Sequence, residues 1–117
     1  MEKKFRYWDP FNGELVSMNN DTALSHFFGN YDKLLYGENN PILEQWTGLK
    51  DKNGVEIFEG DVYHQGDPNI KYVVVWHDTG LKGKQLGSSS YAGISYWQDR
   101  IEIIGNIHLN PELLKKD

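Results

Sequence analysis

The sequence predicts a mainly β protein: a small β-barrel or roll in the C-terminal part, preceded by an N-terminal β-hairpin and a short helical segment. Short runs of β-branched and aromatic residues alternate with turn residues along most of the chain. Glycine is frequent, with 12 in 117 residues, and Asn-Gly pairs mark tight turns. Aromatic residues make up 14% of the chain, enough to build a core from short strands.

The N-terminal third predicts a hairpin followed by a helical arm. Residues 5–8 and 14–18 are strand-prone, and the Asp-Pro-Phe-Asn-Gly sequence between them favours a turn, since proline presets φ and Asn-Gly accepts positive φ. Residues 22–28 carry apolar side chains at helical spacing and end before a glycine. We therefore expect residues 1–40 to form a hairpin and helical arm, packed on a main unit of residues 41–117.

The main unit is expected to contain short strands closed into a barrel or roll. Residues 79–90, rich in glycine and serine, are expected to be a flexible loop, and Asn110-Pro111 should start a final helical turn. A bulge or kink is expected at Gly105. The expected strands cover residues 42–46, 55–58, 61–64, 70–76, 91–97 and 101–109. The expected core residues are Trp46, Ile57, Val62, Val74, Trp76, Ile94, Ile103 and Ile107.

Composition and charge exclude several classes of function. The chain has 12 basic and 17 acidic residues, and its net charge of −5 argues against a broad surface for nucleic acid. The absence of cysteine excludes disulfides, thiolate zinc sites and cysteine nucleophiles. No apolar run is long enough for a transmembrane helix, and the N-terminal MEKKFRYWDP lacks the apolar region of a signal peptide. We expect a cytoplasmic protein without a membrane partner.

Candidate catalytic residues are few. The four histidines lack the spacing of a metal site, so we expect neither a metal nor a cofactor. Glu59, Asp61 and His64 are the best candidates for a hydrolase, but the aspartate follows a predicted strand bend, where carboxylates commonly accept backbone N–H groups. The serines at 88–90 lack a G-x-S-x-G elbow. The sequence therefore favours a protein that is not an enzyme.

One region combines rings with basic residues and is the candidate interaction surface. Rings beside lysine and arginine could stack single-stranded bases if they line one groove. The same side chains are typical of protein interfaces, where tyrosine, tryptophan and arginine contribute strongly to binding. The candidate residues are Lys82, Lys84, Tyr91, Tyr96, Trp97 and Arg100.

Two stretches are far more specific than the rest of the chain. Residues 45–62 read QWTGLKDKNGVEIFEGDV, and residues 102–114 read EIIGNIHLNPELL. Together with KFRYWD at residues 4–9, they closely resemble the YopX family of phage and prophage proteins. Residues 19–40 and 79–90 lie outside the resemblance. It implies a β-rich fold with an SH3-type roll and an origin in a bacteriophage or prophage, hence the cytoplasm of a bacterial host. It brings no established activity and no catalytic residues.

The motif residues each have a folding role that needs no substrate. Asp51 to Gly54 suits a turn between strands, Glu59-Gly60-Asp61 suits a strand bend, and Asn110-Pro111 suits a helix start. We therefore expect these residues to be structural: Trp46, Gly48, Leu49, Asp51, Asn53, Gly54, Glu59, Gly60, Asp61, Gly105, Asn106, Asn110 and Pro111.

The leading hypothesis is a non-enzymatic phage accessory protein that binds other proteins. The expected partners are a second copy of the chain, giving a homo-oligomer, or a phage or host protein. A nucleic-acid-binding small β-barrel is the first alternative, and the hydrolase described above is the second.

Overall fold

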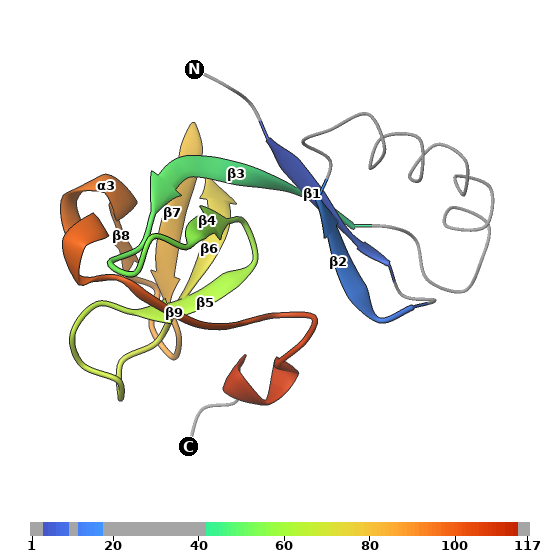
Figure 1. Ribbon diagram of the computed structural model, residues 1–117. Helices are drawn as coiled ribbons and strands as arrows, with labels where there is room; N and C mark the ends of the chain where they lie inside the picture. The colour runs from blue at the N-terminus through green and yellow to red at the C-terminus, as the bar shows by residue number, and fades with distance from the viewer. Residues whose placement is uncertain (1–3, 10–11, 18–41, 115–117) are drawn as a thin grey trace. The chain divides into compact units, whose positions relative to one another are not determined.

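The computed structural model describes residues 4–9, 12–17 and 42–114 (Figure 1). The helix expected over residues 22–28 lies outside these residues. The chain forms two compact units, residues 1–46 and 47–117, whose boundary falls within one strand. Each unit is described by itself.

The first unit contains an antiparallel hairpin. Strand β1 (Phe5–Asp9) pairs with β2 (Glu14–Ser17) on one side and with the first part of β3 (Ile42–Lys50) on the other. The turn closes where the Gly13 amide donates to the Asp9 carbonyl oxygen at 2.8 Å, and Gly13 has φ 64°. This is the left-handed conformation that glycine adopts without cost, so the Asn-Gly turn follows from the sequence.

The second unit is built on a five-stranded sheet in the order β8-β7-β6-β5-β9, with every neighbouring pair antiparallel. The sheet curls, as Figure 1 shows. Strand β4 lies against β3. The strands are β4 (Glu56–Phe58), β5 (Asp61–His64), β6 (Tyr72–His77), β7 (Gly80–Gln85), β8 (Tyr91–Ala92) and β9 (Glu102–Asn106). Two short helices, α3 (Ile94–Trp97) and η1 (Gln98–Arg100), lie between β8 and β9, and η2 (Pro111–Leu114) follows β9.

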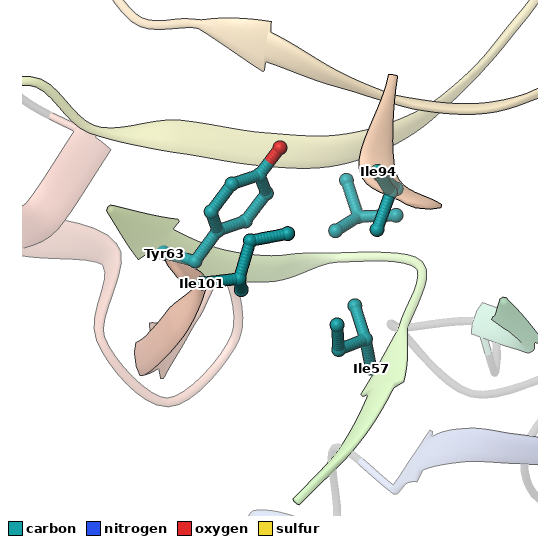
Figure 2. Packing of buried hydrophobic residues seen from close by; sticks show 5 residues of the cluster. Ile57, Tyr63, Ile94 and Ile101 are labelled. Carbon is teal, nitrogen blue, oxygen red and sulfur yellow. The ribbon is translucent and has the colours of Figure 1, made fainter. Parts of the chain in front are cut away.

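The main core lies on one face of this sheet. Figure 2 shows the Tyr63 ring and three isoleucines pointing toward one another. Gly83 on β7 leaves room for that ring, since a Cβ there would lie 2.8 Å from Tyr63 Cζ and closer still to its hydroxyl. The cluster consists of Ile57, Tyr63, Val74, Ile94 and Ile101, all nearly inaccessible to solvent.

The opposite face is covered at one end by the C-terminal residues. Val62 on β5 and Gly105 on β9 are cross-strand partners, so both face this side. A Cβ on Gly105 would lie 2.6 Å from Leu113 Cδ1, which places η2 directly over the strand. The pairing of β5 with β9 shifts register beside Gly105, and this confirms the expected bulge.

The structure corrects three expectations. Residues 80–85 form β7, fully paired with β6, where a flexible loop was expected. The strand expected over residues 91–97 ends at Ala92, and α3 follows because Ile94 turns into the core. The strand expected over 101–109 ends at Asn106, whose side-chain oxygen accepts the His108 amide at 2.8 Å and closes a turn.

Two of the expected core residues, Trp46 and Ile107, are only half-buried and lie outside the main core cluster, and a third, Trp76, is 57% exposed. Trp76 lies near the end of β6, next to the turn into β7, where the core no longer covers the strand. The near-continuous apolar run of β6 predicted burial along the whole strand, but the core does not cover the end that carries Trp76.

Candidate functional site

The six candidate surface residues separate into two groups. Lys82 and Lys84 lie on β7, and Lys84 is the cross-strand partner of Tyr91 on β8. Cross-strand partners share a face of the sheet, so these three side chains lie together. The His77 ring stacks on Tyr91 with centroids 3.7 Å apart and an interplanar angle of 10°. We call this set, Lys82, Lys84, Tyr91 and His77, the lysine–ring face.

The lysine–ring face lies on the side of the sheet opposite the main core. Val74, in the core, is the partner of Gly83, and both point to the core side. Because side chains alternate along a strand, the neighbours Lys82 and Lys84 point the other way. The two lysines are also the charged residues of β6, β7 and β8. An acidic chain thus presents a locally basic face with stacked rings.

The second group lies in α3 and η1, on the core side. Tyr96 is 82% exposed. Its ring meets Trp97 edge-on, with centroids 4.9 Å apart and an interplanar angle of 78°. The Arg100 guanidinium carbon lies 5.7 Å from the centre of the Trp97 ring. Trp97 in turn packs against the main core, so one ring anchors the group. We call Tyr96, Trp97 and Arg100 the aromatic corner.

A small pocket adjoins the aromatic corner. Its volume is about 180 Å³, and Trp97 forms part of its wall. The other walls come from Tyr72 on β6 and from the β5–β6 connection. Sequence reasoning missed this pocket, because nothing in the Gly-Asp-Pro-Asn loop shows that it folds beside a residue 30 positions later. The lining residues are Gln65, Asp67, Ile70, Tyr72 and Trp97.

Most of the motif residues make contacts with the backbone. Asp51, buried, accepts the amides of Asn53 and Val55 with Oδ1, at 2.8 and 2.9 Å, and that of Ile103 with Oδ2, at 3.1 Å. Gly54 has φ 83° and donates to the Asp51 carbonyl oxygen. One carboxylate therefore closes the Asn-Gly turn and covers the outer edge of β9.

A second set of motif residues joins β5 to the C-terminus. Asp61 accepts the Phe58 backbone amide at 2.8 Å, and its Oδ1 lies 3.5 Å from the side-chain nitrogen Nδ2 of Asn106. The Asn110 side-chain oxygen accepts the Asn106 amide at 3.2 Å. Gly60 has φ 89° and donates to the Val74 carbonyl oxygen at 2.8 Å. These contacts tie the strand bend, the end of β9 and the start of η2 to one another.

The remaining motif residues shape β3 and η2. Gly48 has φ 89°, and beside it the Thr47 hydroxyl donates to the Ile57 carbonyl oxygen and accepts the Leu49 amide. Leu49 packs at the edge of the main core, and Pro111 is the first residue of η2. In the first unit, the Trp46 ring lies 4.6 Å from the Lys4 ammonium.

The hydrolase candidates do not share a site. Asp61 and His64 are three residues apart on β5, which places their side chains on opposite faces. His64 Nδ1 accepts the Gly66 amide at 3.2 Å, and its Nε2 lies 3.9 Å from Glu102. Glu59, half-buried, precedes the bend. In the part of the chain that the structure describes, no three histidine, aspartate or glutamate side chains group as metal ligands.

Two side chains of the second unit have shifted pKa values, one in the core and one at the edge of the sheet. Burial raises the pKa of Tyr63, whose hydroxyl points across Gly83. The Lys52 ammonium, 2.8 Å from Glu102, lowers the pKa of that carboxyl through a hydrogen bond and its charge. Among the residues that the structure describes, no helix is long and apolar enough to cross a membrane.

Comparisons with known proteins agree with the resemblance seen in the sequence. The family model described as "YopX protein" matches residues 4–115. The crystal structure of protein EF1440 from Enterococcus faecalis is similar over 98% of this chain and 99% of that one, with 26% identity and a TM-score of 0.67. No curated protein matches. Because the family model spans nearly the whole chain, including both motif stretches, this protein belongs to the YopX family.

Proposed function

We propose that this protein is a non-enzymatic accessory protein of a phage or prophage, acting in the bacterial cytoplasm by binding another protein. The observation that supports this best is Tyr96, which is 82% exposed although its ring is held edge-on against Trp97. A ring held in place loses little conformational freedom on binding. Tyrosine, tryptophan and arginine, the three members of the aromatic corner, are also the residues that dominate binding energy at interfaces.

The environment of the motif residues supports a role without catalysis. Asp51 and Asp61 accept backbone amides, and Asn106 and Asn110 close turns. Carboxylates used in this way stabilise the fold and are not available to a substrate. We also propose that residues 47–114 form an SH3-like roll that carries the binding surface.

Self-association is tested by light scattering over a range of protein concentrations. The wild-type chain should exceed its monomer mass of 13.6 kDa at high concentration. Tyr96→Ala should shift it to monomer, whereas Tyr91→Ala, on the opposite face of the sheet, should not. A second copy is excluded as the partner if the wild-type chain remains monomeric throughout.

Binding to a different protein is tested by placing a photo-crosslinking residue at position 96 in prophage-bearing cells. The same residue at position 91 is the matched control. A discrete adduct should form from position 96 alone. Absence of any adduct, combined with a monomeric wild-type chain, would contradict the proposed function.

A second candidate function is binding of single-stranded nucleic acid, favoured by the lysine–ring face. Stacked rings beside lysines, free of carboxylates along β6, β7 and β8, match the pattern of such surfaces. Fluorescence anisotropy with a labelled oligothymidine at low salt should show binding that weakens steeply as salt rises. Lys82→Gln with Lys84→Gln should abolish it. Binding equal in the variant and the wild type would eliminate this candidate.

A further inference from the structure

We propose that the pocket beside the aromatic corner accepts a cationic side chain, the guanidinium of an arginine or the ammonium of a lysine, from the bound protein. This inference rests on the proposed function, because it names the chemistry of the partner at that same surface. The pocket is lined by Gln65, Asp67, Ile70, Tyr72 and Trp97.

The walls of the pocket suit the apolar stem and the charged end of such a side chain. Tyr72 and Trp97 contribute rings, and Ile70, 39% exposed, contributes an aliphatic surface. Ring faces attract cations, and tryptophan does so most strongly. The Arg100 guanidinium already lies 5.7 Å from the centre of the Trp97 ring, so this ring attracts a cation within the chain itself. The volume of about 180 Å³ fits one long side chain and not a drug-sized ligand.

The polar groups at the pocket include the Asp67 carboxylate, which when ionised can only accept hydrogen bonds. Asp67 Oδ1 accepts the Asn69 amide at 2.9 Å, which fixes the carboxylate in a turn. The Gln65 amide nitrogen donates to the Tyr72 hydroxyl at 3.3 Å. A guanidinium or ammonium brings several hydrogen-bond donors, and the Asp67 side chain is exposed and can accept them.

The charge that lines the pocket favours a cation over an anion. One carboxylate lines the pocket and no basic residue does; the Arg100 guanidinium lies beside the Trp97 ring but is not part of the lining. The lysines of the lysine–ring face point to the opposite side of the sheet, so they do not neutralise Asp67. An acidic segment or a phosphate would meet the Asp67 carboxylate, which repels negative charge.

The test uses acetyl-arginine amide and acetyl-lysine amide as probes of the full chain. Acetyl-citrulline amide is the uncharged control, since it keeps the shape of arginine. The indole N–H resonance of Trp97, assigned through Trp97→Phe, reports binding in an NMR titration. We expect saturable shifts with dissociation constants of about 1 mM for the cationic probes, as befits a single side chain, and none with the citrulline probe.

Variants locate the binding. Asp67→Asn should weaken the cationic probes about fivefold, as expected for loss of one exposed charge. Asp78→Asn is the matched control, because Asp78 is exposed, lies outside the pocket and has φ 60°, which asparagine tolerates. Equal shifts from the citrulline and arginine probes, or equal affinity of the wild type and Asp67→Asn, would overturn the inference.

The same measurements separate this inference from the proposed function. Crosslinking from position 96 without probe binding would retain a protein partner and reject a cationic contact in the pocket. If the cation comes from a second copy, free acetyl-arginine amide should reduce the mass seen by light scattering. If it comes from another protein, the probe should bind and leave the mass at that of the monomer.

Discussion

The motif residues and the aromatic corner differ in what their side chains contact. Asp51, Asp61, Asn106 and Asn110 are engaged with backbone groups of the same chain. Tyr96 instead is 82% exposed, and its ring makes a T-shaped contact with the Trp97 ring. The stretches most typical of the family therefore build the fold, whereas the surface best suited to a partner lies outside them.

In a small β protein, this difference indicates which side chains stabilise the fold and which can bind a partner. A carboxylate that accepts three backbone amides is engaged within the fold, whereas an exposed ring that packs against a neighbouring ring can contact a partner. The two classes should respond differently to substitution, with stability changing in the first and binding in the second.

The largest loss of stability is expected from Asp51→Ala. The substitution leaves the amides of Asn53, Val55 and Ile103 without their acceptor, and the last lies 52 residues away in the chain. We expect a loss of about 3 kcal/mol in the free energy of unfolding, measured by urea denaturation. Asp51→Asn, which keeps one acceptor oxygen for the turn, should lose about half as much. Equal losses in the two variants would contradict this role.

Gly83→Ala should be next. A Cβ at Gly83 would overlap the Tyr63 hydroxyl and lie 2.8 Å from Cζ, inside a filled core. Overpacking of this kind costs about 2 kcal/mol. Tyr63→Phe removes the overlapping hydroxyl, which has no hydrogen-bond partner among the described residues, so alone it should be close to neutral. In a double-mutant cycle it should recover part of the loss, and strict additivity would exclude the contact.

The elements that sequence predicted well are those specified by local chemistry. The Asn-Gly turns at Gly13 and Gly54 have the positive φ expected, and the bulge lies beside Gly105. Strand β7 was missed because its glycines and lysines are typical of a loop. Gly83 is a strand residue for a non-local reason, the close approach of Tyr63, and sequence does not reveal which ring lies over a glycine.

The candidate site was predicted in composition but not in arrangement. Six residues between 82 and 100 were expected to act as one surface, yet strand alternation sends Lys82 and Lys84 to one side, and packing on the core sends Trp97 to the other. The short helix α3 causes the separation, and its four residues are too few to show a helical period. The pocket was not predictable, because its lining residues meet only through the fold of the sheet.

A smaller, pH-dependent effect is expected at the edge of the sheet. Lys52 lowers the pKa of Glu102 below its ordinary value of 4.5. The ion pair therefore adds stability above that value, and the contribution is lost as pH falls through the lowered pKa. Urea midpoints for the wild type and Glu102→Gln should differ at pH 7 and converge as the pH falls below the lowered pKa of Glu102. A difference that persists unchanged at low pH would show that the charge is not responsible.

The smallest effect on stability is expected from Tyr96→Ala. With 82% of its surface exposed, the ring buries little area, so the loss should stay below about 1 kcal/mol, most of it from the edge-on contact with Trp97. The same substitution should abolish self-association at this surface, as measured by light scattering. Loss of the Tyr96 side chain should weaken binding and leave the free energy of unfolding nearly unchanged, and this distinguishes the aromatic corner from Asp51. A large loss of stability with unchanged binding would place Tyr96 among the structural residues and remove the contrast between the two regions.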